Sequence, residues 1–243
     1  MGKKKKLSSM NLEQFSYKEA THEDVKVRCR ILIVCEGEKT EPSYFKSFDQ
    51  MQHGSVVYEI DCEGGKINTV QVVEKAIELR NKAIDNHTPY DAVWAVFDKD
   101  DFPASSFNAA IEKARQHEIG CAWSNEAFEL WYVFHFVNRV TAMNREEYKR
   151  AISKYVNESP AYQQKTPYSY QKNDPKAHMI MTTYGDETRA IRFAKNQAGT
   201  FFDTRYATHN PCTTVYELVS LLRGENKKFN QKIMDDLGDE EPK

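Results

Sequence analysis

Residues 31–37, ILIVCEG, take the chain from five consecutive apolar residues directly into an acid. A short apolar run rich in β-branched residues is typical of a strand that is buried on both faces of a parallel sheet. Glu36 and Gly37 then predict the turn that leaves the sheet. Because an unpaired buried carboxylate costs several kcal/mol, Glu36 at this place indicates a metal ion, a basic partner or a solvent-filled cleft.

Residues 92–101, AVWAVFDKDD, show the same pattern of a buried strand that ends in acids. Side chains alternate along an extended chain, so Asp98 and Asp100 are expected on one side and Lys99 on the other. The carboxyl ends of parallel strands open at one edge of the sheet, where α/β proteins bind ligands. Glu36, Asp98 and Asp100 are therefore expected to converge. Such a set of oxygen ligands suits Mg²⁺ or Mn²⁺.

The rest of the N-terminal half alternates strand and helix signals. Strands are predicted at residues 25–35, 56–62, 92–97 and 121–123, and helices begin near Thr40, at the Asn68 cap and at Ser105 or Ser106. In the first strand, Arg28 and Arg30 alternate with apolar residues, which indicates entry from a solvent-exposed edge. The alternation predicts a doubly wound α/β core with a mainly parallel sheet over residues 25–124.

A mostly helical extension is predicted after the core. Residues 124–126 are expected to cap an apolar helix that reaches Phe136, in which Glu129 is either a rim glutamate that reaches water or a ligand aimed into the acidic cleft. His135 in the same helix is expected to be a core histidine. The predicted domains are a basic arm (1–24), a catalytic core (25–136), a helical extension (137–224) and a frayed acidic tail (225–243).

Three features of the extension have functional interpretations. A helix capped by Asn144 carries four basic residues, which form either a solvated face or a substrate-facing patch: Arg145, Lys149, Arg150 and Lys154. The Tyr-rich segment 158–175 is expected to be a long loop, whose aromatic residues either stack on unpaired bases or pack on their own domain. Further helices are predicted over residues 186–197 and from Thr214 to Gly224, the second with a Thr214–Glu217 capping box.

Composition excludes several classes of protein. No apolar stretch of about 18 residues exists, so no membrane span is predicted. Five cysteines without a Cys-x-x-Cys pair favour reduced thiols in a cytoplasmic protein. The net charge of −2 means that nucleic-acid binding requires a local basic patch. The Gly37–Thr40 segment, GEKT, lacks the glycines of a phosphate-binding P-loop.

Glutamate after the first strand and Asp-x-Asp after the third together resemble the Toprim domain of topoisomerases, primases and related nucleases. In that family the glutamate is a general acid/base or metal ligand and the aspartates bind Mg²⁺. Residue by residue, this similarity covers Glu36, Asp98 and Asp100.

Three longer strings, residues 35–45 (CEGEKTEPSYF), 124–131 (SNEAFELW) and 210–215 (NPCTTV), resemble the RloB family of restriction-linked proteins. The resemblance spans residues 31–222. It implies a Toprim-like, metal-dependent nuclease of bacterial anti-phage, abortive-infection loci, often encoded beside an ATPase. It also adds Glu41, Glu129 and Lys172 to the candidate catalytic residues.

The resulting hypothesis is a phosphodiester hydrolase with Mg²⁺ or Mn²⁺ held by Glu36, Asp98 and Asp100. Glu41 or Glu129 would complete a second metal position. Lys39 or Lys172 would offset negative charge on the phosphate. The alternative is a non-catalytic regulator of an ATPase with a structural ion site. A primase-like transferase is a third interpretation, for which no second catalytic module is visible. The sequence does not distinguish DNA, transfer RNA and other RNA as the substrate, and it does not determine the oligomeric state.

Overall fold

The computed structural model describes residues 27–65 and 67–238, so the predicted basic arm lies outside the described residues. A six-stranded sheet has the order β2-β3-β1-β4-β5-β6. Its four central strands are parallel: β3 (Val56–Gly64), β1 (Val27–Cys35), β4 (Ala92–Asp98) and β5 (Gly120–Asn125). Two-residue antiparallel strands flank them, β2 (Gln52–His53) beside β3 and β6 (Cys212–Thr213) beside β5.

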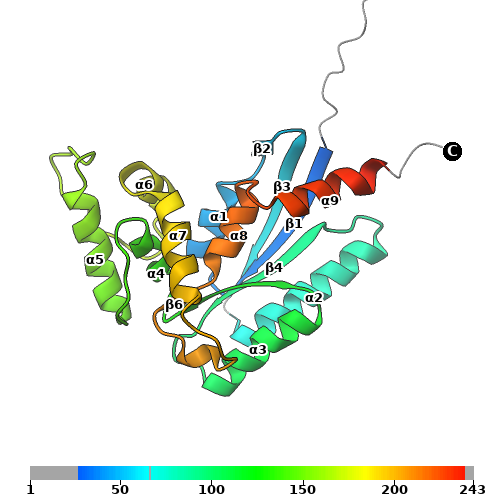
Figure 1. Ribbon diagram of the computed structural model, residues 1–243, viewed down its shortest axis with the longest axis horizontal. Helices are drawn as coiled ribbons and strands as arrows, with labels where there is room; N and C mark the ends of the chain where they lie inside the picture. Colours follow the sequence, from blue (N-terminus) through cyan, green and yellow to red (C-terminus); the bar gives the residue numbers. More distant parts are fainter. Residues whose placement is uncertain (1–26, 66, 239–243) are drawn as a thin grey trace, which may run out of the picture.

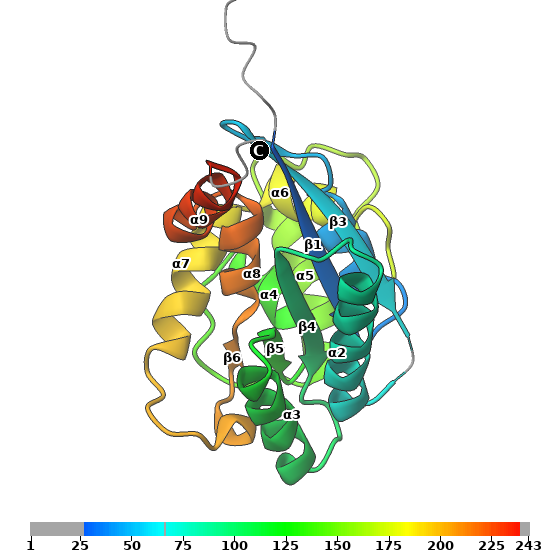
Figure 2. The same ribbon diagram turned by 90° about the vertical axis from the view of Figure 1, so that its right-hand side faces the viewer.

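Helices cover both faces of the sheet (Figures 1 and 2). On one face lie α2 (Thr69–Asp85) and α3 (Ala104–Gln116). The opposite face carries α1 (Thr40–Lys46), α4 (Glu129–Phe134), α5 (Arg145–Glu158), α6 (Ala177–Tyr184), α7 (Glu187–Ala198), α8 (Val215–Leu222) and α9 (Lys227–Gly238). A short 3₁₀ helix, η1 (Tyr206–Thr208), precedes β6. This arrangement confirms the predicted mixed α/β fold with a mainly parallel sheet. Among the described residues, no helix has the length and apolar character needed to cross a membrane.

The apolar run in β1 is continuous because both of its faces are covered. Ile31 and Ile33 belong to the core under α1 and α4, whereas Leu32 and Val34 belong to the core under α2 and α3. All four side chains are 1% exposed or less. Buried apolar surface on both faces makes this strand the centre of the fold.

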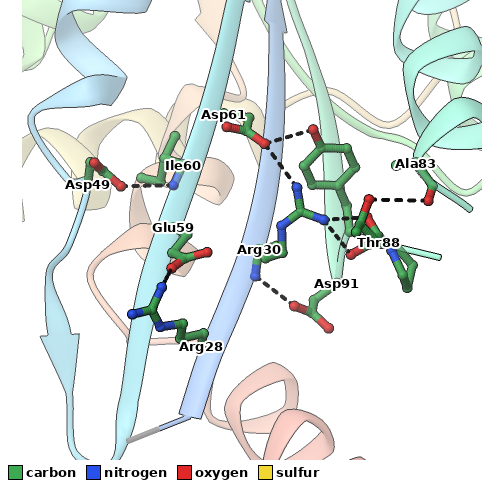
Figure 3. Close-up of polar contacts among 11 residues, drawn as sticks. Arg28, Arg30, Asp49, Glu59, Ile60, Asp61, Ala83, Thr88 and Asp91 are labelled. Atoms are coloured by element: carbon green, nitrogen blue, oxygen red, sulfur yellow. Dashed lines mark hydrogen bonds and ion pairs between the residues drawn. The ribbon is translucent and has the colours of Figure 1, made fainter. Parts of the chain in front are cut away.

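The first half of β1 is polar on one side, as the alternation of its sequence predicts. Arg28 pairs with Glu59 on β3, and the Arg30 guanidinium lies 3.3 Å from a carboxylate oxygen of Asp61 (Figure 3). The backbone N–H of Arg30 donates to Asp91 at 2.7 Å, which ties β1 to the start of β4. The strand thus passes from a solvent-exposed end into the core.

Local helix signals were confirmed at some positions and wrong at others. The predicted caps are present at Asn68 and at Asn144 with Glu147, and the Asn68 cap is a full capping box with Gln71, which was not predicted. Pro103, not a serine, is the N-cap of α3. The predicted Thr214 capping box is wrong, because the Thr214 hydroxyl instead accepts a bond from the Trp123 N–H at 2.9 Å and so extends the pairing at the edge of β5.

The predicted start of the fourth helix is also wrong. Ser124 and Asn125 do not cap a helix, because both continue β5 and pair with Thr213 and Cys212 of β6. Helix α4 begins only at Glu129. This short, fully buried helix carries the apolar residues that the sequence assigned to a longer one.

Two helices lie in segments for which no helix was predicted. Helix α6 follows the Tyr-rich loop, and α9 covers residues that we predicted to be frayed. The tail prediction is therefore wrong for 227–238, while 239–243 lie outside the described residues. Helix α9 is held by Ile233, which is 4% exposed, and by Asn230, whose side chain accepts a 2.6 Å bond from the Tyr58 hydroxyl.

Candidate functional site

The site lies where the chain leaves β1 and β4, which are neighbours in the sheet. Helix α1 follows β1 on one face, and α3 follows β4 on the other, so the connections diverge at this point. Such a switch point is the usual ligand-binding crevice of open α/β sheets. Glu36 continues the pairing of β1, because its N–H donates to Val96 at 2.9 Å, and its carboxylate accepts the Asp98 N–H at 3.2 Å.

A cavity of about 810 Å³ opens at this edge of the sheet. Six of the residues singled out from the sequence line it: Glu36, Lys39, Glu41, Asp98, Asp100 and Lys172. The start of α2 contributes Asn68 and Gln71, and Arg145 and Asn173 complete much of the wall. Segments that are far apart in the sequence therefore meet at one cavity with acidic and basic walls.

Burial and mutual repulsion dominate the electrostatics of the acids. Burial, reinforced by Glu41 and Asp100, raises the pKa of Glu36 from 4.5 to about 7 against the opposing Asp98 N–H bond and Arg145. Burial and the nearby charges of Glu41, Glu129 and Glu36 raise the pKa of Asp98 well above its usual value. Burial and the neighbouring acids therefore favour the protonated form of both carboxyls in the absence of a further cation.

The pKa of Glu41 is also raised, first by burial and then by the charge of Glu129. Glu41 is 8% exposed and lies against the backbone of Gly37, where an added Cβ would come within 2.2 Å of a Glu41 carboxylate oxygen. Gly37 is thus required for the close approach of this side chain. The structure brings Glu41 to the predicted acidic site.

Asp98 and Asp100 reach the same guanidinium group. Arg145 Nη2 lies 2.8 Å from Asp100 Oδ2 and 3.9 Å from Asp98 Oδ2. The Lys99 ammonium instead donates to the carbonyls of Asp100 and Phe102, at 3.1 and 2.6 Å. The two aspartates therefore face one group and Lys99 another, as predicted, but not through alternation along a strand, because β4 ends at Asp98 and Asp100 has a φ of 40°.

The basic residues of the predicted helix have different surroundings. Arg145, the first residue of α5, reaches the cavity, so the substrate-facing interpretation applies to this residue. Lys149 pairs with Glu146 on the same helix, and Arg150 is exposed, which fits a solvated face. The sequence marked Arg145 as basic but gave no signal that it contacts the aspartates.

Glu129 is buried and does not line the cavity, although its charge acts on Glu41 and Asp98. It is 6% exposed, so the interpretation as a rim glutamate that reaches water is wrong. The Tyr170 hydroxyl donates to Glu129 Oε1 at 3.1 Å, and Tyr170 itself is 3% exposed. This tyrosine of the loop therefore packs on its own domain rather than offering a face to unpaired bases.

The Tyr-rich loop is also tied to α1. The Asn173 N–H donates to the Thr40 hydroxyl at 3.2 Å, and that hydroxyl donates to the Asn173 side chain at 3.1 Å. These contacts flank Lys172 and hold it at the cavity. Lys172 is thus placed by two anchors, Tyr170 on Glu129 and Asn173 on Thr40.

His135 is a core residue, as expected. Its Nδ1 lies 3.0 Å from the Trp131 carbonyl, and burial lowers its pKa to about 4. At neutral pH this imidazole is uncharged. It does not line the cavity.

The donor chemistry at the cavity fits a hard divalent cation. Glu36, Asp98 and Asp100 supply only oxygen atoms, and burial together with neighbouring acids raises the pKa of Glu36 and Asp98, so a nearby cation would favour their ionised forms. As the side chains are arranged, however, no group of three or more His, Cys, Asp or Glu residues that could hold a metal ion occurs within 27–65 and 67–238. Arg145 occupies the oxygens of the two aspartates instead. The residues fit the ion, but the site is not preformed.

Comparison with known proteins gave one match. The family model described as RloB-like protein matches residues 31–222. Searches of curated proteins and of solved structures gave no match. The matched segment contains both strand-end acids and all of the predicted site residues, and it covers more than half of the chain. The chain therefore belongs to the RloB-like protein family.

Proposed function

We propose that this protein is a Toprim-type, metal-dependent nuclease that acts in bacterial anti-phage defence by abortive infection. Its reaction would be hydrolysis of phosphodiester bonds in RNA, with transfer RNA one candidate, or in DNA. The observation that carries the proposal is the meeting of Glu36, Asp98 and Asp100 in one cavity at the β1/β4 switch point. Membership of the RloB-like family supports the same function.

Each residue has a role that its surroundings support. Glu36, with a pKa of about 7, can accept and release a proton at neutral pH, as a general acid/base must. Asp98 and Asp100 would hold Mg²⁺ or Mn²⁺, with Glu41 or Glu129 completing a second position. A bound ion of this kind would polarise the phosphate and lower the pKa of a water molecule.

The basic side of the cavity would bind the substrate. Lys39 and Lys172 line the wall, so their ammonium groups can neutralise the charge that develops on the phosphate during hydrolysis. A neighbouring ATPase as partner belongs to this proposal through the family resemblance alone, and a cytoplasmic location through the five free cysteines.

A second function is favoured by one specific observation. Arg145 already contacts Asp98 and Asp100, and the described part of the chain contains no formed metal-binding group. The acids could then serve a non-catalytic regulator of a defence ATPase. In that protein the cluster would have a structural role.

Phage challenge of cells separates the two functions. We would express the wild type, Asp98→Ala, Asp100→Ala and Asp101→Ala with the neighbouring ATPase and run total RNA and DNA on gels. Asp101 is the matched control, because it is an exposed carboxylate next to the site that does not line the cavity. The nuclease predicts degradation with the wild type and Asp101→Ala, and none with Asp98→Ala or Asp100→Ala.

The regulator predicts equal protection by all four proteins with nucleic acids intact. A thermal melt without metal checks the fold of the inactive variants. Asp98→Ala should melt no earlier than the wild type, because removal of one carboxylate relieves repulsion within the cluster. An Asp98→Ala protein that melts earlier and still cleaves would contradict the site assignment.

A further inference from the structure

The Arg145 guanidinium occupies an unusual position that the proposed reaction does not explain. It starts from the first residue of α5, outside the α/β core, and contacts Asp98 at the end of β4 and Asp100 just after it. Its Nε atom is buried and lacks a hydrogen-bond partner within the described residues. The side chain is therefore only partly satisfied at this place.

Electrostatics explains why the side chain stays there. Burial of Arg145 works against its positive charge, yet Asp100, Asp98, Glu129 and Glu36 together raise its pKa. In return, Arg145 opposes the rise in the pKa of Glu36 and of Asp98. The guanidinium thus acts as a counter-cation of the acidic cluster.

The contact is nevertheless weak as an ion pair. Nη2 alone approaches the carboxylates, at 2.8 Å from Asp100 and 3.9 Å from Asp98, rather than two nitrogens in the bidentate arrangement that makes arginine pairs strong. Part of the side chain, 34%, is exposed. A pair with one short contact and solvent access exchanges its arginine for a metal ion more readily than a buried bidentate pair would.

A carboxylate oxygen that contacts the Arg145 guanidinium is less available to coordinate a metal ion. We propose that Arg145 is an internal competitor of the divalent metal at Asp98 and Asp100, which holds the acidic site together without metal and lowers its metal affinity. This inference rests on the proposed metal site and assigns a further positioning residue to it. It also accounts for a site whose donors fit a metal ion while their present arrangement does not.

The size of the effect follows from charge. One positive charge a few ångströms from a divalent ion weakens binding by at least about tenfold, even at the dielectric constant of water. Arg145→Gln removes that charge while keeping a polar side chain that can donate to the aspartates. Arg145→Lys keeps the charge, and Arg150→Gln removes one charge from the exposed side of the same helix.

Calorimetric titration of the full chain with MnCl₂ tests the proposal. We expect Arg145→Gln to bind Mn²⁺ about tenfold tighter than the wild type, whereas Arg145→Lys and Arg150→Gln should stay within about threefold of it. Without metal, Arg145→Gln should melt earlier than the wild type, because the carboxylates lose their counter-cation.

Two results would overturn the inference, and only the second of them would also rule out the proposed metal site. If Asp98→Ala abolishes Mn²⁺ binding but Arg145→Gln binds no tighter than the wild type, the metal site stands and competition by Arg145 is wrong. If neither the wild type nor Arg145→Gln binds Mn²⁺, both the inference and the proposed metal site are wrong.

A second measurement requires no substitution at Arg145 and covers the case in which Arg145→Gln does not fold. The Nε–Hε NMR signal of Arg145 in the wild type should shift as MgCl₂ is added and should saturate with metal binding. A signal that stays in place while Mg²⁺ binds at Asp98 would contradict displacement of the guanidinium.

Discussion

Replacement of Glu36 by glutamine should stabilise the metal-free protein, and more so as the pH rises. Burial raises the pKa of this carboxyl from 4.5 to about 7 in the folded protein. Between these values the folded state binds a proton that the unfolded state has released, so the contribution of Glu36 to wild-type stability falls as pH rises. The loss begins near pH 4.5 and is complete above about pH 7. Glu36→Gln has no such loss.

The expected gain follows from the two pKa values. A difference of this size corresponds to about 3 kcal/mol at full burial, at about 1.4 kcal/mol per pH unit. Because Glu36 is partly exposed at the cavity, solvent screening reduces the expected gain to about 1–3 kcal/mol at pH 8. Near pH 4.5 the gain should vanish. Glutamine can still accept the Asp98 N–H bond that Glu36 accepts at 3.2 Å.

Urea unfolding at pH 5, 6, 7 and 8 in the presence of a chelator measures this effect. Glu146→Gln is the control, because Glu146 is an exposed acid on α5 whose pKa is lowered by its bond to Lys149. That variant should show no growing gain with pH. Parallel pH profiles for Glu36→Gln and the wild type would refute the account of Glu36 as a buried acid under repulsion.

Three further substitutions test other parts of the structure. Tyr170→Phe removes the donor to buried Glu129 and should lower the free energy of unfolding by about 1–3 kcal/mol, measured by urea titration; an unchanged value would contradict the loop anchor. Gly64→Ala places a Cβ within 2.5 Å of the Gly37 carbonyl and should lower the melting temperature by several degrees, unless the two turns can separate. Because burial lowers the His135 pKa to about 4, the contribution of His135 to the free energy of unfolding should fall by about 3 kcal/mol from pH 6.5 to pH 4, opposite in sign to that of Glu36, and His135→Gln should gain stability relative to the wild type over this range in thermal melts.

The sequence was most informative where the structural signal is local. The apolar run around Ile31 and the caps at Asn68 and Asn144 depend on neighbouring residues, and all three are present in the structure. The signals at Asn125 and Thr214 failed for a shared reason. These residues belong to segments about ninety positions apart that pair with one another at the edge of β5, and such pairing outweighs a local capping preference.

The candidate site was predictable only as far as the sheet determines it. Adjacent parallel strands bring Glu36 and Asp98 to one edge, and that convergence needs no knowledge of the helical extension. Arg145 reaches the aspartates from α5, and Tyr170 reaches Glu129 from a loop. Their positions depend on how separate helices pack against one another, and the periodicity of apolar residues in the sequence does not indicate this packing. The metal ligands and catalytic roles remain predictions.

The two short antiparallel strands have a consequence for association with other molecules. Strand β2 pairs with the start of β3, and beyond it the Asp49 carboxylate accepts the Ile60 N–H at 2.9 Å (Figure 3). On the far side, β6 and the Thr214 hydroxyl occupy the edge of β5. Backbone groups at these places are therefore not free to recruit a strand from another chain. The outer strands β2 and β6 are each only two residues long, so the sheet offers little edge for pairing or aggregation with another chain there.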